Sequence, residues 1–411
     1  MNIKNSKNTR LLIISQHYPP DRSGNASRIF DMSSHLQKLG DEVTILAPYP
    51  SFPPGSFQRK WSLSEFKMIK GINLINLLSW QPGSENPNFV SRMAYYLSFP
   101  LHTVFWIVFN SRKFDVVISS APPIFTGFGG LISKLFFKKK WCMDVRDLWI
   151  DASISLGFLK KGSFFERISR WYEQICYTNA DMIGVTTQEL GRRILNTYKK
   201  VDEKKIKVVS NGVDTEFFYP VEVNKKKQII YAGNIGHAQD LENVILSMKT
   251  IIKKVDLKFL IVGDGDIKTP LEALAKREGL SKNIKFTGLV PRENIPLMFS
   301  ESMIGIAALK KIPSLEYAVP TKAYEYMACR IPFVGCGNGE IRYLAEKSGG
   351  GVIADNSPDA IAETIMDLLN NPQKMSEMGK KGREFVKLYY DRKQIATKLK
   401  TYIDTIGDAA E

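Results

Sequence analysis

The chain has 411 residues, a length at which a single hydrophobic core usually gives way to two domains. Its 44% hydrophobic content is typical of a globular enzyme, and its four cysteines, none in a Cys-x-x-Cys pair, exclude a disulfide framework and a cysteine zinc site. Sparse cysteines predict a reducing cytosol, and the net charge of +15 predicts an anionic partner.

The first half of the chain alternates short apolar runs with helix-length segments. Runs rich in valine and isoleucine are typical of parallel strands covered on both faces, so we expect a doubly wound α/β domain. The N-terminal residues lack an apolar stretch followed by a cleavage site, which predicts a cytoplasmic location. The predicted strands are residues 10–15, 42–47, 114–120, 139–145 and 180–187.

The longest apolar run, residues 95–109, contains Pro100 and His102. It is shorter than the ~20 residues that a membrane-spanning helix needs. We therefore expect a buried helix here, with a membrane-dipping helix as the alternative.

The same alternation starts again near residue 226 and predicts a second α/β domain. We place the first domain at 1–218, the second at 219–385 and a helical tail at 386–411 that packs back on the first domain. Two such domains are expected to face each other across a ligand-binding cleft. The strands predicted in this half are residues 226–236, 257–265, 283–290, 303–309, 331–337 and 350–354.

Most of the net positive charge, +12 of +15, lies in residues 1–200, which contain 26 Lys and Arg against 14 Asp and Glu. Lysines stand beside phenylalanines in 131–141 and 156–171, a combination that favours an anionic membrane surface. A solvated lysine-rich surface is the alternative, and no recognition motif supports nucleic-acid binding. The lysines assigned to the membrane and acceptor side are Lys138, Lys139, Lys140, Lys160 and Lys161.

Loops that follow strands are where an α/β sheet binds ligands, and two of them stand out in the first half. Gly24 opens a helix after the first strand, where backbone N–H groups can approach an anion, although a plain loop glycine beside a capping Ser23 or Asn25 fits equally. Arg146 and Asp147 lie in a crowded stretch of charges that suits sugar hydroxyls or a structural ion-pair network.

In the second half, Gly233 and Asn234 repeat the strand, glycine and helix arrangement. Lys322 occupies the first turn of a predicted helix, where the helix macrodipole disfavours a cation unless an anion is held there. Glu325, one turn later, is expected to accept the two hydroxyls of a ribose or to form a local pair with Lys322.

Taken together, these motifs resemble the retaining glycosyltransferases of family four, which have the two-domain GT-B fold. The likeness covers nearly the whole chain and is closest to the bacterial branch that builds O-antigen, colanic acid and capsule, which includes N-acetyl-fucosaminyl transferases. The motifs that carry it are "HYPPDRSGNASR", "SNGVDTEFF", "VGDGD", "IKFTGLVPRENIPLMFSES" and "PTKAYEYMACRIPFVG".

The resemblance implies roles for individual residues. Glu325 matches the second glutamate of a paired motif that holds the ribose, and Glu316, next to Tyr317, is the candidate for the first. Asn234 and Gln239 stand where the family has an arginine and a lysine, so the charge of the diphosphate falls to Lys322 with Lys310 or Lys311. The implied donor-binding residues are Gly24, Asn25, Gly233, Asn234, Lys311, Glu316, Lys322 and Glu325, and the implied catalytic residues are Arg146, Asp147 and Lys322.

The implied function is transfer of a hexosyl or N-acetylhexosaminyl unit from a nucleotide diphosphate donor, a UDP-sugar first, to a lipid-linked or polysaccharide acceptor at the inner face of the plasma membrane. No metal or other cofactor is expected, because Lys322, the start of its helix and the loop of Gly24 are expected to stabilise the leaving group. Two alternatives remain open at this point: a sugar-nucleotide epimerase of the same fold and a non-catalytic sugar-nucleotide-binding partner.

Overall fold

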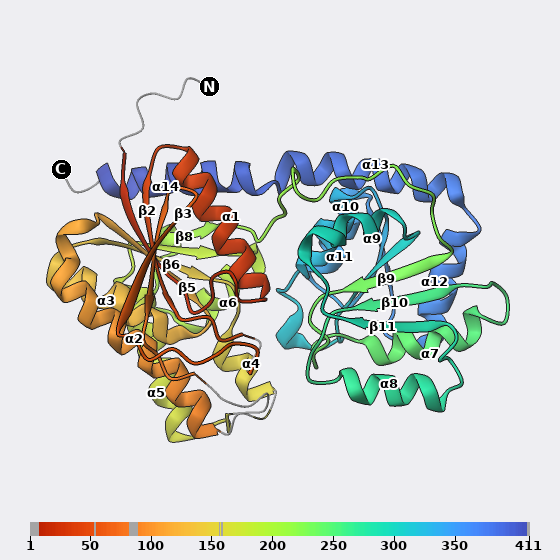
Figure 1. Ribbon diagram of the computed structural model, residues 1–411, viewed down its shortest axis with the longest axis horizontal. Coiled ribbons are helices and arrows are strands. Elements are labelled where there is room, and N and C mark those ends of the chain that lie inside the picture. Colours follow the sequence, from red (N-terminus) through yellow and green to blue (C-terminus); the bar gives the residue numbers. More distant parts are fainter. Residues whose placement is uncertain (1–7, 53–54, 82–88, 156, 158, 409–411) are drawn as a thin grey trace. The chain divides into compact units, whose positions relative to one another are not determined.

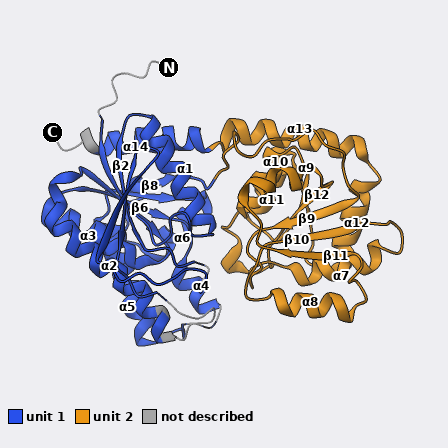
Figure 2. Cartoon of the chain, in the orientation of Figure 1, with its two compact units in different colours: residues 1–211, 392–411 blue, residues 212–391 orange. Residues whose placement is uncertain are grey.

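The computed structural model describes residues 8–52, 55–81, 89–155, 157 and 159–408 (Figure 1). The chain divides into two compact units, residues 1–211 with 392–411 and residues 212–391 (Figure 2). Each unit has its own sheet, and helix α14 (Arg392–Asp408), at the end of the chain, belongs to the first unit and packs on α1 (Gly24–Lys38).

The first unit is built on an eight-stranded sheet in the order β3-β4-β2-β1-β5-β6-β7-β8. All neighbouring strands are parallel except the edge pair β3 and β4. Strand β1 lies in the middle, and the chain runs outward from it first through β2 and then through β5, so the strand order reverses at β1. The strands are β1 Arg10–Ile14, β2 Glu42–Pro48, β3 Ser64–Ile69, β4 Ile72–Leu77, β5 Val116–Ala121, β6 Lys140–Val145, β7 Met182–Val185 and β8 Ile206–Val208.

The edge strands β3 and β4 form a hairpin that the apolar pattern did not predict. Their connection is the dipeptide Lys70-Gly71, and both residues have positive φ, at 49° and 81°. Positive φ at both central residues is the mark of a tight turn whose twist suits a hairpin. Strand β3 is mostly exposed and mixes polar with apolar residues, so it lacks the continuous apolar run that marks the predicted strands.

Helices cover both faces of the first sheet. One face is covered by α1 and α14, whose apolar side chains join alternate strand residues such as Leu11, Ile13 and Val43 in one core. The other face packs on α2 and α3, and α5 packs in turn on α3. The helices and short 3₁₀ turns between β2 and α14 are α2 Phe89–Asn110, η1 Ser111–Lys113, η2 Ile124–Thr126, α3 Gly127–Phe137, α4 Trp149–Ser155, α5 Phe164–Asn179, α6 Gln188–Thr197 and η3 Glu203–Lys205.

A glycine allows α3 to lie close to the sheet. A Cβ atom at Gly130 would fall 2.0 Å from Nε1 of Trp141, a completely buried residue of β6. The indole N–H of Trp141 donates to Ser119 Oγ at 2.8 Å, so the ring is fixed and a larger residue at 130 would have to displace the helix.

Helix α2 is the buried helix expected from the apolar run, and it keeps one face exposed. Phe99, Thr103 and Ile107 recur every four residues and are fully buried. Phe105 and Phe109, on the opposite side, are 63% and 71% exposed. Across the described residues, no helix is long and apolar enough to cross a membrane.

The second unit has a six-stranded, all-parallel sheet in the order β11-β10-β9-β12-β13-β14. Counted within the unit, this is the order 3-2-1-4-5-6 of the Rossmann fold. Together with the first unit it confirms the prediction of two doubly wound α/β domains. The strands are β9 Gln228–Ala232, β10 Lys258–Val262, β11 Ile284–Gly288, β12 Ile304–Ala308, β13 Phe333–Cys336 and β14 Gly351–Ala354.

The helices of the second unit form separate cores with the two faces of its sheet. One core joins α7, α8 and α12 to strand residues such as Ile229, and the other joins α10 and α11 to residues such as Ile230. The helices and 3₁₀ turns are α7 Leu241–Ile251, α8 Lys268–Arg277, η4 Arg292–Asn294, α9 Ile295–Ser300, η5 Pro313–Leu315, α10 Thr321–Ala328, α11 Glu340–Ser348, α12 Pro358–Leu369 and α13 Pro372–Tyr389.

Candidate functional site

Lys322 of α10 lies beside the loop that follows β9, at the point where the strand order of the second sheet reverses. Strands β9 and β12 are neighbours there. A Cβ atom at Gly233 would lie 3.2 Å from Cε and 3.3 Å from Nζ of Lys322. Ligands of open α/β sheets bind outside the strand ends at such a reversal. The structure therefore brings two of the predicted site residues, Gly233 and Lys322, together where a ligand is expected.

The ammonium group of Lys322 is buried and held by one aromatic residue. Its Nζ donates to the hydroxyl of Tyr231 at 2.9 Å and lies 4.0 Å from the centre of the Tyr231 ring. Burial lowers the pKa of Lys322 to about 7, and the negative charge of Glu325 opposes part of that shift. A bound anion would favour the charged form of this lysine, because it would replace the missing solvation.

Helix α10 presents its N-terminus in the same place. Pro320 is its N-cap residue and makes no side-chain hydrogen bond to the first turn. Uncapped N–H groups carry the positive end of the helix macrodipole and suit an anion. Glu325 lies one turn later and is partly exposed.

The loops after β9 and β10 are joined by backbone hydrogen bonds. Gly233 N donates to Val262 O at 2.9 Å, and Ile235 N donates to Asp264 O at 2.8 Å. The hydroxyl of Tyr231 also donates to the carbonyl oxygen of Asn234. Asn234 itself is exposed, so its side chain lies at the open surface of this fixed loop.

The other predicted residues of the second unit have different surroundings. The carbonyl oxygen of Glu316 accepts from Glu340 N at 2.8 Å, and its side chain is partly exposed, whereas Tyr317 is buried. Lys311 is exposed and lies 3.5 Å from a carboxylate oxygen of Asp355. Lys310, also exposed, donates its backbone N–H to Ala238 O at 3.0 Å. None of these three contacts involves the ammonium of Lys322.

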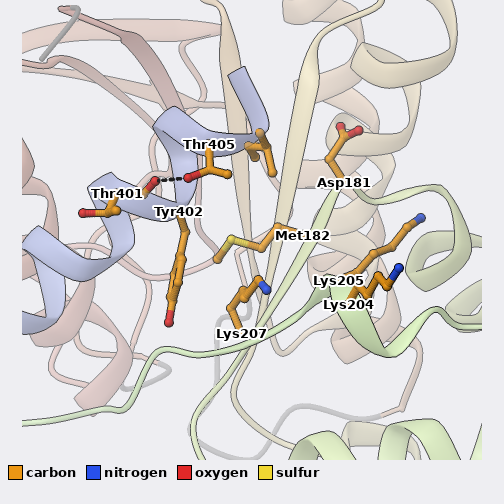
Figure 3. A pocket seen from close by; sticks show the side chains of 9 residues that line it. Asp181, Met182, Lys204, Lys205, Lys207, Thr401, Tyr402 and Thr405 are labelled. Carbon is orange, nitrogen blue, oxygen red and sulfur yellow. Dashed lines mark hydrogen bonds between the residues drawn. The ribbon is translucent and has the colours of Figure 1, made fainter. Parts of the chain in front are cut away.

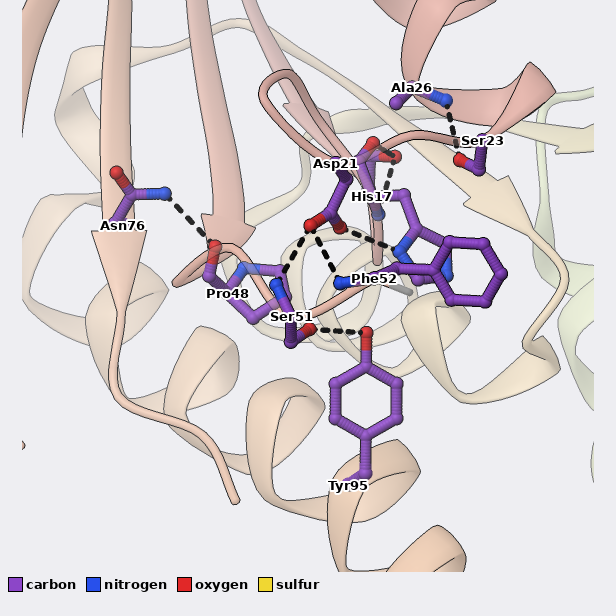
Figure 4. A network of polar contacts seen from close by, with 10 residues as sticks. His17, Asp21, Ser23, Ala26, Pro48, Ser51, Phe52, Asn76 and Tyr95 are labelled. Carbon is purple, nitrogen blue, oxygen red and sulfur yellow. Dashed lines mark hydrogen bonds and ion pairs between the residues drawn. The ribbon is translucent and has the colours of Figure 1, made fainter. Parts of the chain in front are cut away.

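In the first unit, the loop that follows β1 is fixed by a buried carboxylate (Figure 4). Asp21 accepts from the backbone N–H groups of Ser51 and Phe52 at 2.8 and 2.9 Å. It also contacts Nδ1 of His17 at 2.8 Å, and the Tyr95 hydroxyl and Ser51 Oγ are 3.0 Å apart. This network holds the segment that leads into α1 and Gly24.

Gly24 and Asn25 begin α1, and Ser23 caps it by accepting from Ala26 N at 3.1 Å. The capping alternative at this loop is therefore present. A Cβ atom at Gly24 would meet nothing within 4 Å, so the space above the helix start is open. Both polar atoms of the buried Asn25 amide lack a hydrogen-bond partner, and such groups usually meet a partner in the functional state.

Two of the crowded charges after β6 are held in ion pairs. Arg28 binds Asp144 through two hydrogen bonds of 2.6 and 3.0 Å, and both side chains are almost fully buried. Asp151 pairs with Arg170 at 2.8 Å. The ion-pair alternative therefore holds for Asp144 and Asp151.

Arg146 lies beside this pair. Burial, with a smaller contribution from the nearby Arg28, lowers the pKa of Arg146 to about 10, and the charges of Asp144 and Asp147 oppose part of this shift. Its buried Nε has no hydrogen-bond partner. Arg146 and Asp147 follow β6 and Gly24 follows β1, so all three residues lie beyond the carboxyl ends of the strands of the first sheet.

The five lysines assigned to the membrane side are accompanied by exposed apolar residues. Leu135 and Phe136 are 55% and 72% exposed at the end of α3, and Phe164 and Phe165 are 69% and 65% exposed at the start of α5. Lys138, Lys160 and Lys161 are exposed, whereas Lys139 and Lys140 are partly buried. These residues form two groups, one at the end of α3 and the start of β6 and one just before and at the start of α5, and we refer to the two groups together as the basic aromatic face.

Two cavities lie in the first unit, away from the residues described so far. One has a volume of about 420 Å³ and lies between the ends of β7, β8 and α14, where Lys204, Lys207 and Tyr402 line it (Figure 3). The other, of about 340 Å³, is lined by Trp61 and Trp80 among others. No set of three or more His, Cys, Asp or Glu within the described ranges is arranged to hold a metal ion.

Sequence reasoning did not single out Tyr231, Arg28 or the pair of His17 and Asp21. Tyr231 lies 91 residues from Lys322, and Arg28 lies 116 residues from Asp144. Each had the appearance of an ordinary strand, helix or loop residue. The quoted "HYPPDRSGNASR" motif contains His17, Asp21 and Arg28, which is the one available signal.

Two family models match the chain, one in each half. The model described as Glycosyltransferase Family 4 matches residues 22–217, and the one described as Glycosyl transferases group 1 matches residues 213–385. The two matches together extend over residues 22–385 and meet where the first compact unit gives way to the second.

Curated relatives are distant but extensive. The putative colanic acid biosynthesis glycosyl transferase WcaI of Escherichia coli (strain K12) is 22% identical over 343 residues, which are 78% of this chain and 81% of WcaI. The probable glycosyltransferase WbjE of Pseudomonas aeruginosa is 25% identical over 63% of this chain and 67% of its own length.

Solved structures share the fold over nearly the full chain. Sucrose-phosphate synthase from Thermosynechococcus elongatus is 17% identical and has a TM-score of 0.77, with 98% of this chain and 100% of that chain covered. Anabaena HepE in complex with UDP-glucose is 13% identical and has a TM-score of 0.72, with 97% and 100% covered.

Proposed function

Because the chain is a glycosyltransferase of the GT-B and family four type, we propose that it transfers a sugar from a nucleoside diphosphate donor to a saccharide acceptor in glycan synthesis. The observation that carries the proposal is the position of Lys322, a buried cation beside Gly233 at the strand reversal of the second sheet. A diphosphate suits this position, because it meets one lysine and the uncapped N-terminus of α10 together.

The proposed role of Lys322 is to stabilise the departing nucleotide. As the bond between the sugar and the diphosphate breaks, negative charge grows on the phosphate oxygens. A preorganised donor aimed at growing charge lowers the barrier by about 3–4 kcal/mol in comparable sites. Because Tyr231 already fixes the ammonium, Lys322 needs little reorganisation when that charge develops.

The remaining predicted residues take the neighbouring parts of the donor. Glu325 lies one helical turn beyond Lys322 and is proposed to accept the hydroxyls of the ribose, with Glu316 as its candidate partner. Gly24 and Asn25 are proposed to face the phosphates from the first unit, where the unpartnered amide of Asn25 supports a polar ligand. Arg146 and Asp147 are proposed to contact the transferred sugar.

A UDP-sugar is the proposed donor, and a lipid-linked saccharide is the proposed acceptor. HepE, whose fold this chain shares, is described in complex with UDP-glucose, and WcaI is named for colanic acid biosynthesis. The first description supports a UDP-sugar donor, and the second supports a polysaccharide product. The basic aromatic face supports an acceptor held at an anionic membrane, because basic and apolar groups together favour an interface.

The test is a thermal-shift panel of UDP-sugars and GDP-sugars on the full chain. A ligand that binds only the native state raises the melting temperature, so a donor should do so and an unrelated nucleotide should not. Lys322→Met and Glu325→Gln should abolish the shift. Lys225→Met is the matched control, because the Lys225 ammonium donates to Ser302 O at 2.7 Å before β12, at the opposite end of the strands.

Turnover separates the proposed transferase from the two alternatives. Release of UDP that depends on an added acceptor supports a transferase, whereas an isomerised donor formed without acceptor would identify an epimerase. Binding without any turnover in the wild-type chain would identify a non-catalytic partner and would contradict the proposal.

A further inference from the structure

We propose that the cavity lined by Trp61 and Trp80 is a binding subsite for one saccharide ring of the acceptor. This inference rests on the proposed transferase function and adds to it a place where the acceptor sugar is recognised. The cavity has a volume of about 340 Å³, within the range of about 300–1,000 Å³ that is usual for small-molecule sites. Its lining residues are Trp61, Leu78, Ser79, Trp80, Ser98 and His102.

The cavity lies beyond the carboxyl ends of the parallel strands of the first sheet, where the proposed donor-facing loops also lie. Residues 78–80 directly follow β4, and β4 is parallel to β2, which is parallel to β1. The segment after β4 and the loop after β1, which contains Gly24, therefore both leave the sheet at the carboxyl ends of the strands. An acceptor sugar bound after β4 would lie two strands from β1 in the sheet order.

Two indole rings give this cavity an aromatic surface. Trp80 is held in place, because its backbone N donates to Ser98 Oγ and its Nε1 donates to Ser91 Oγ, both at 2.8 Å. Trp61 is 65% exposed, so its side chain is accessible to a ligand. Fixed aromatic faces bind at little entropic cost, and their negative faces attract the C–H groups of a sugar ring.

Polar groups lie beside the indoles. Ser79 is 5% exposed, and its hydroxyl has no hydrogen-bond partner. His102 Nδ1 lies 3.1 Å from the carbonyl oxygen of Leu78. Because a carbonyl oxygen only accepts, Nδ1 carries the proton, which leaves Nε2 as an acceptor in the neutral ring. The guanidinium of Arg59, 5.3 Å from the centre of the Trp80 ring, adds a donor.

This combination suits a pyranose better than an isoprenoid chain. A pyranose has C–H groups on its faces and hydroxyl groups around its rim, so it can cover the indoles and also satisfy the hydroxyl of Ser79. An isoprenoid chain would cover the indoles and leave that buried hydroxyl unpartnered, which carries a cost of about 1–3 kcal/mol. The structure therefore favours the sugar part of the acceptor.

The test measures saccharide binding by saturation-transfer NMR on the full chain in the presence of UDP. The probes are the methyl glycosides of glucose, galactose, N-acetylglucosamine and fucose, with farnesyl phosphate as the isoprenoid probe. We expect at least one methyl glycoside to receive saturation from the wild-type chain. That signal should fall at least fivefold in Trp61→Ala and in Trp80→Ala, and part of it should return in Trp80→Phe.

Phe66→Ala is the matched control, because Phe66 is 60% exposed on β3 and does not line the cavity. Its saccharide signal should equal that of the wild type. Trp61→Ala is expected to fold normally, since a side chain so exposed contributes little to stability, so a loss of signal in this variant reports on binding. The thermal shift produced by UDP should be the same in all four variants.

The outcomes distinguish the subsite from the donor function. If UDP stabilises the chain but no methyl glycoside binds, or binding survives in both tryptophan variants, the subsite is refuted and the transferase proposal stands. If farnesyl phosphate alone binds and its binding depends on the tryptophans, the cavity binds the lipid part of the acceptor and the saccharide subsite is refuted. If the methyl glycoside binds through the tryptophans while no nucleotide sugar binds the chain, the transferase proposal fails, and the cavity is a saccharide site but not an acceptor subsite.

Discussion

The ammonium of Lys322 lies 2.9 Å from the hydroxyl of Tyr231 and 4.0 Å from the centre of its ring. Tyr231 lies on β9, and Lys322 lies on α10, the helix that follows the neighbouring strand β12. Tyr231 holds the lysine by a neutral hydrogen bond and by its ring face, neither of which compensates fully for lost hydration. The pKa of Lys322 is consequently about 7, and a bound anion would favour its charged form.

The first prediction concerns stability in the absence of ligand. The pKa of Lys322 is about 7 in the folded chain and 10.5 as a free side chain. Between these values the unfolded chain binds the extra proton, so this site makes the free energy of unfolding rise with pH, by up to about 1.4 kcal/mol per pH unit. Below pH 7 both states are protonated and the cost of burial is constant.

Urea denaturation at pH 6, 7, 8 and 9 measures this contribution. Lys322→Met should be more stable than the wild type at pH 6–7, and the difference should shrink as the pH rises. Lys276→Met, at an exposed position of α8, should parallel the wild type at every pH. If the free energy of unfolding of Lys322→Met also parallels that of the wild type at every pH, the pKa of Lys322 is not lowered by folding.

The second prediction concerns donor binding. A UDP-sugar would raise the pKa of Lys322, so binding above pH 7 should take up a proton and weaken as the pH rises. The effect approaches tenfold per pH unit between the pKa values of the free and bound states. Calorimetry in two buffers with different ionisation enthalpies counts the protons directly. Lys322→Met should show weak binding with no proton uptake, and equal uptake in that variant would assign the proton to another group.

The third prediction concerns the buried ion pair between Arg28 and Asp144. Removing one partner leaves the other charge buried alone, so Arg28→Met should lower the free energy of unfolding by about 3–5 kcal/mol. The double variant Arg28→Met/Asp144→Leu removes both charges and should recover much of that loss. Urea denaturation of the three chains gives the values, and a double variant as unstable as the single one would contradict the argument.

The fourth prediction concerns the basic aromatic face. Each lysine near an anionic membrane contributes about 1 kcal/mol, so replacing Lys138, Lys139, Lys140, Lys160 and Lys161 together by glutamate should release the chain from phosphatidylserine vesicles. Sedimentation with the vesicles measures binding. A control variant in the second unit should still bind; it replaces Lys253, Lys254, Lys276, Lys282 and Lys285 by glutamate.

A separate variant tests the apolar part of this face. Phe136→Ser/Phe164→Ser should weaken binding without changing its dependence on salt, because the charges stay in place. If the five-lysine variant sediments with the vesicles as the wild type does, the membrane part of the proposal is wrong.

Much of the architecture was predictable from the sequence. Continuous runs such as residues 10–15 and 226–236 contain strands β1 and β9, because parallel strands covered on both faces need apolar residues at every position. The hairpin β3 and β4 escaped prediction for the converse reason. One of its strands lies exposed at the sheet edge and mixes polar with apolar residues, so it has no continuous apolar run, and its turn depends on positive φ at Lys70 and Gly71.

The sequence by itself determined two α/β domains, the loops that follow their strands and the oddity of a lysine in the first turn of α10. Only the tertiary structure decided which loops meet. The order of parallel strands depends on crossover connections that leave no mark on local composition, and this order places Lys322 against Tyr231 and Gly233. Pairing across 91 or 116 residues is set by packing of whole layers, which is why the partners of Lys322 and Asp144 appeared only in the folded chain.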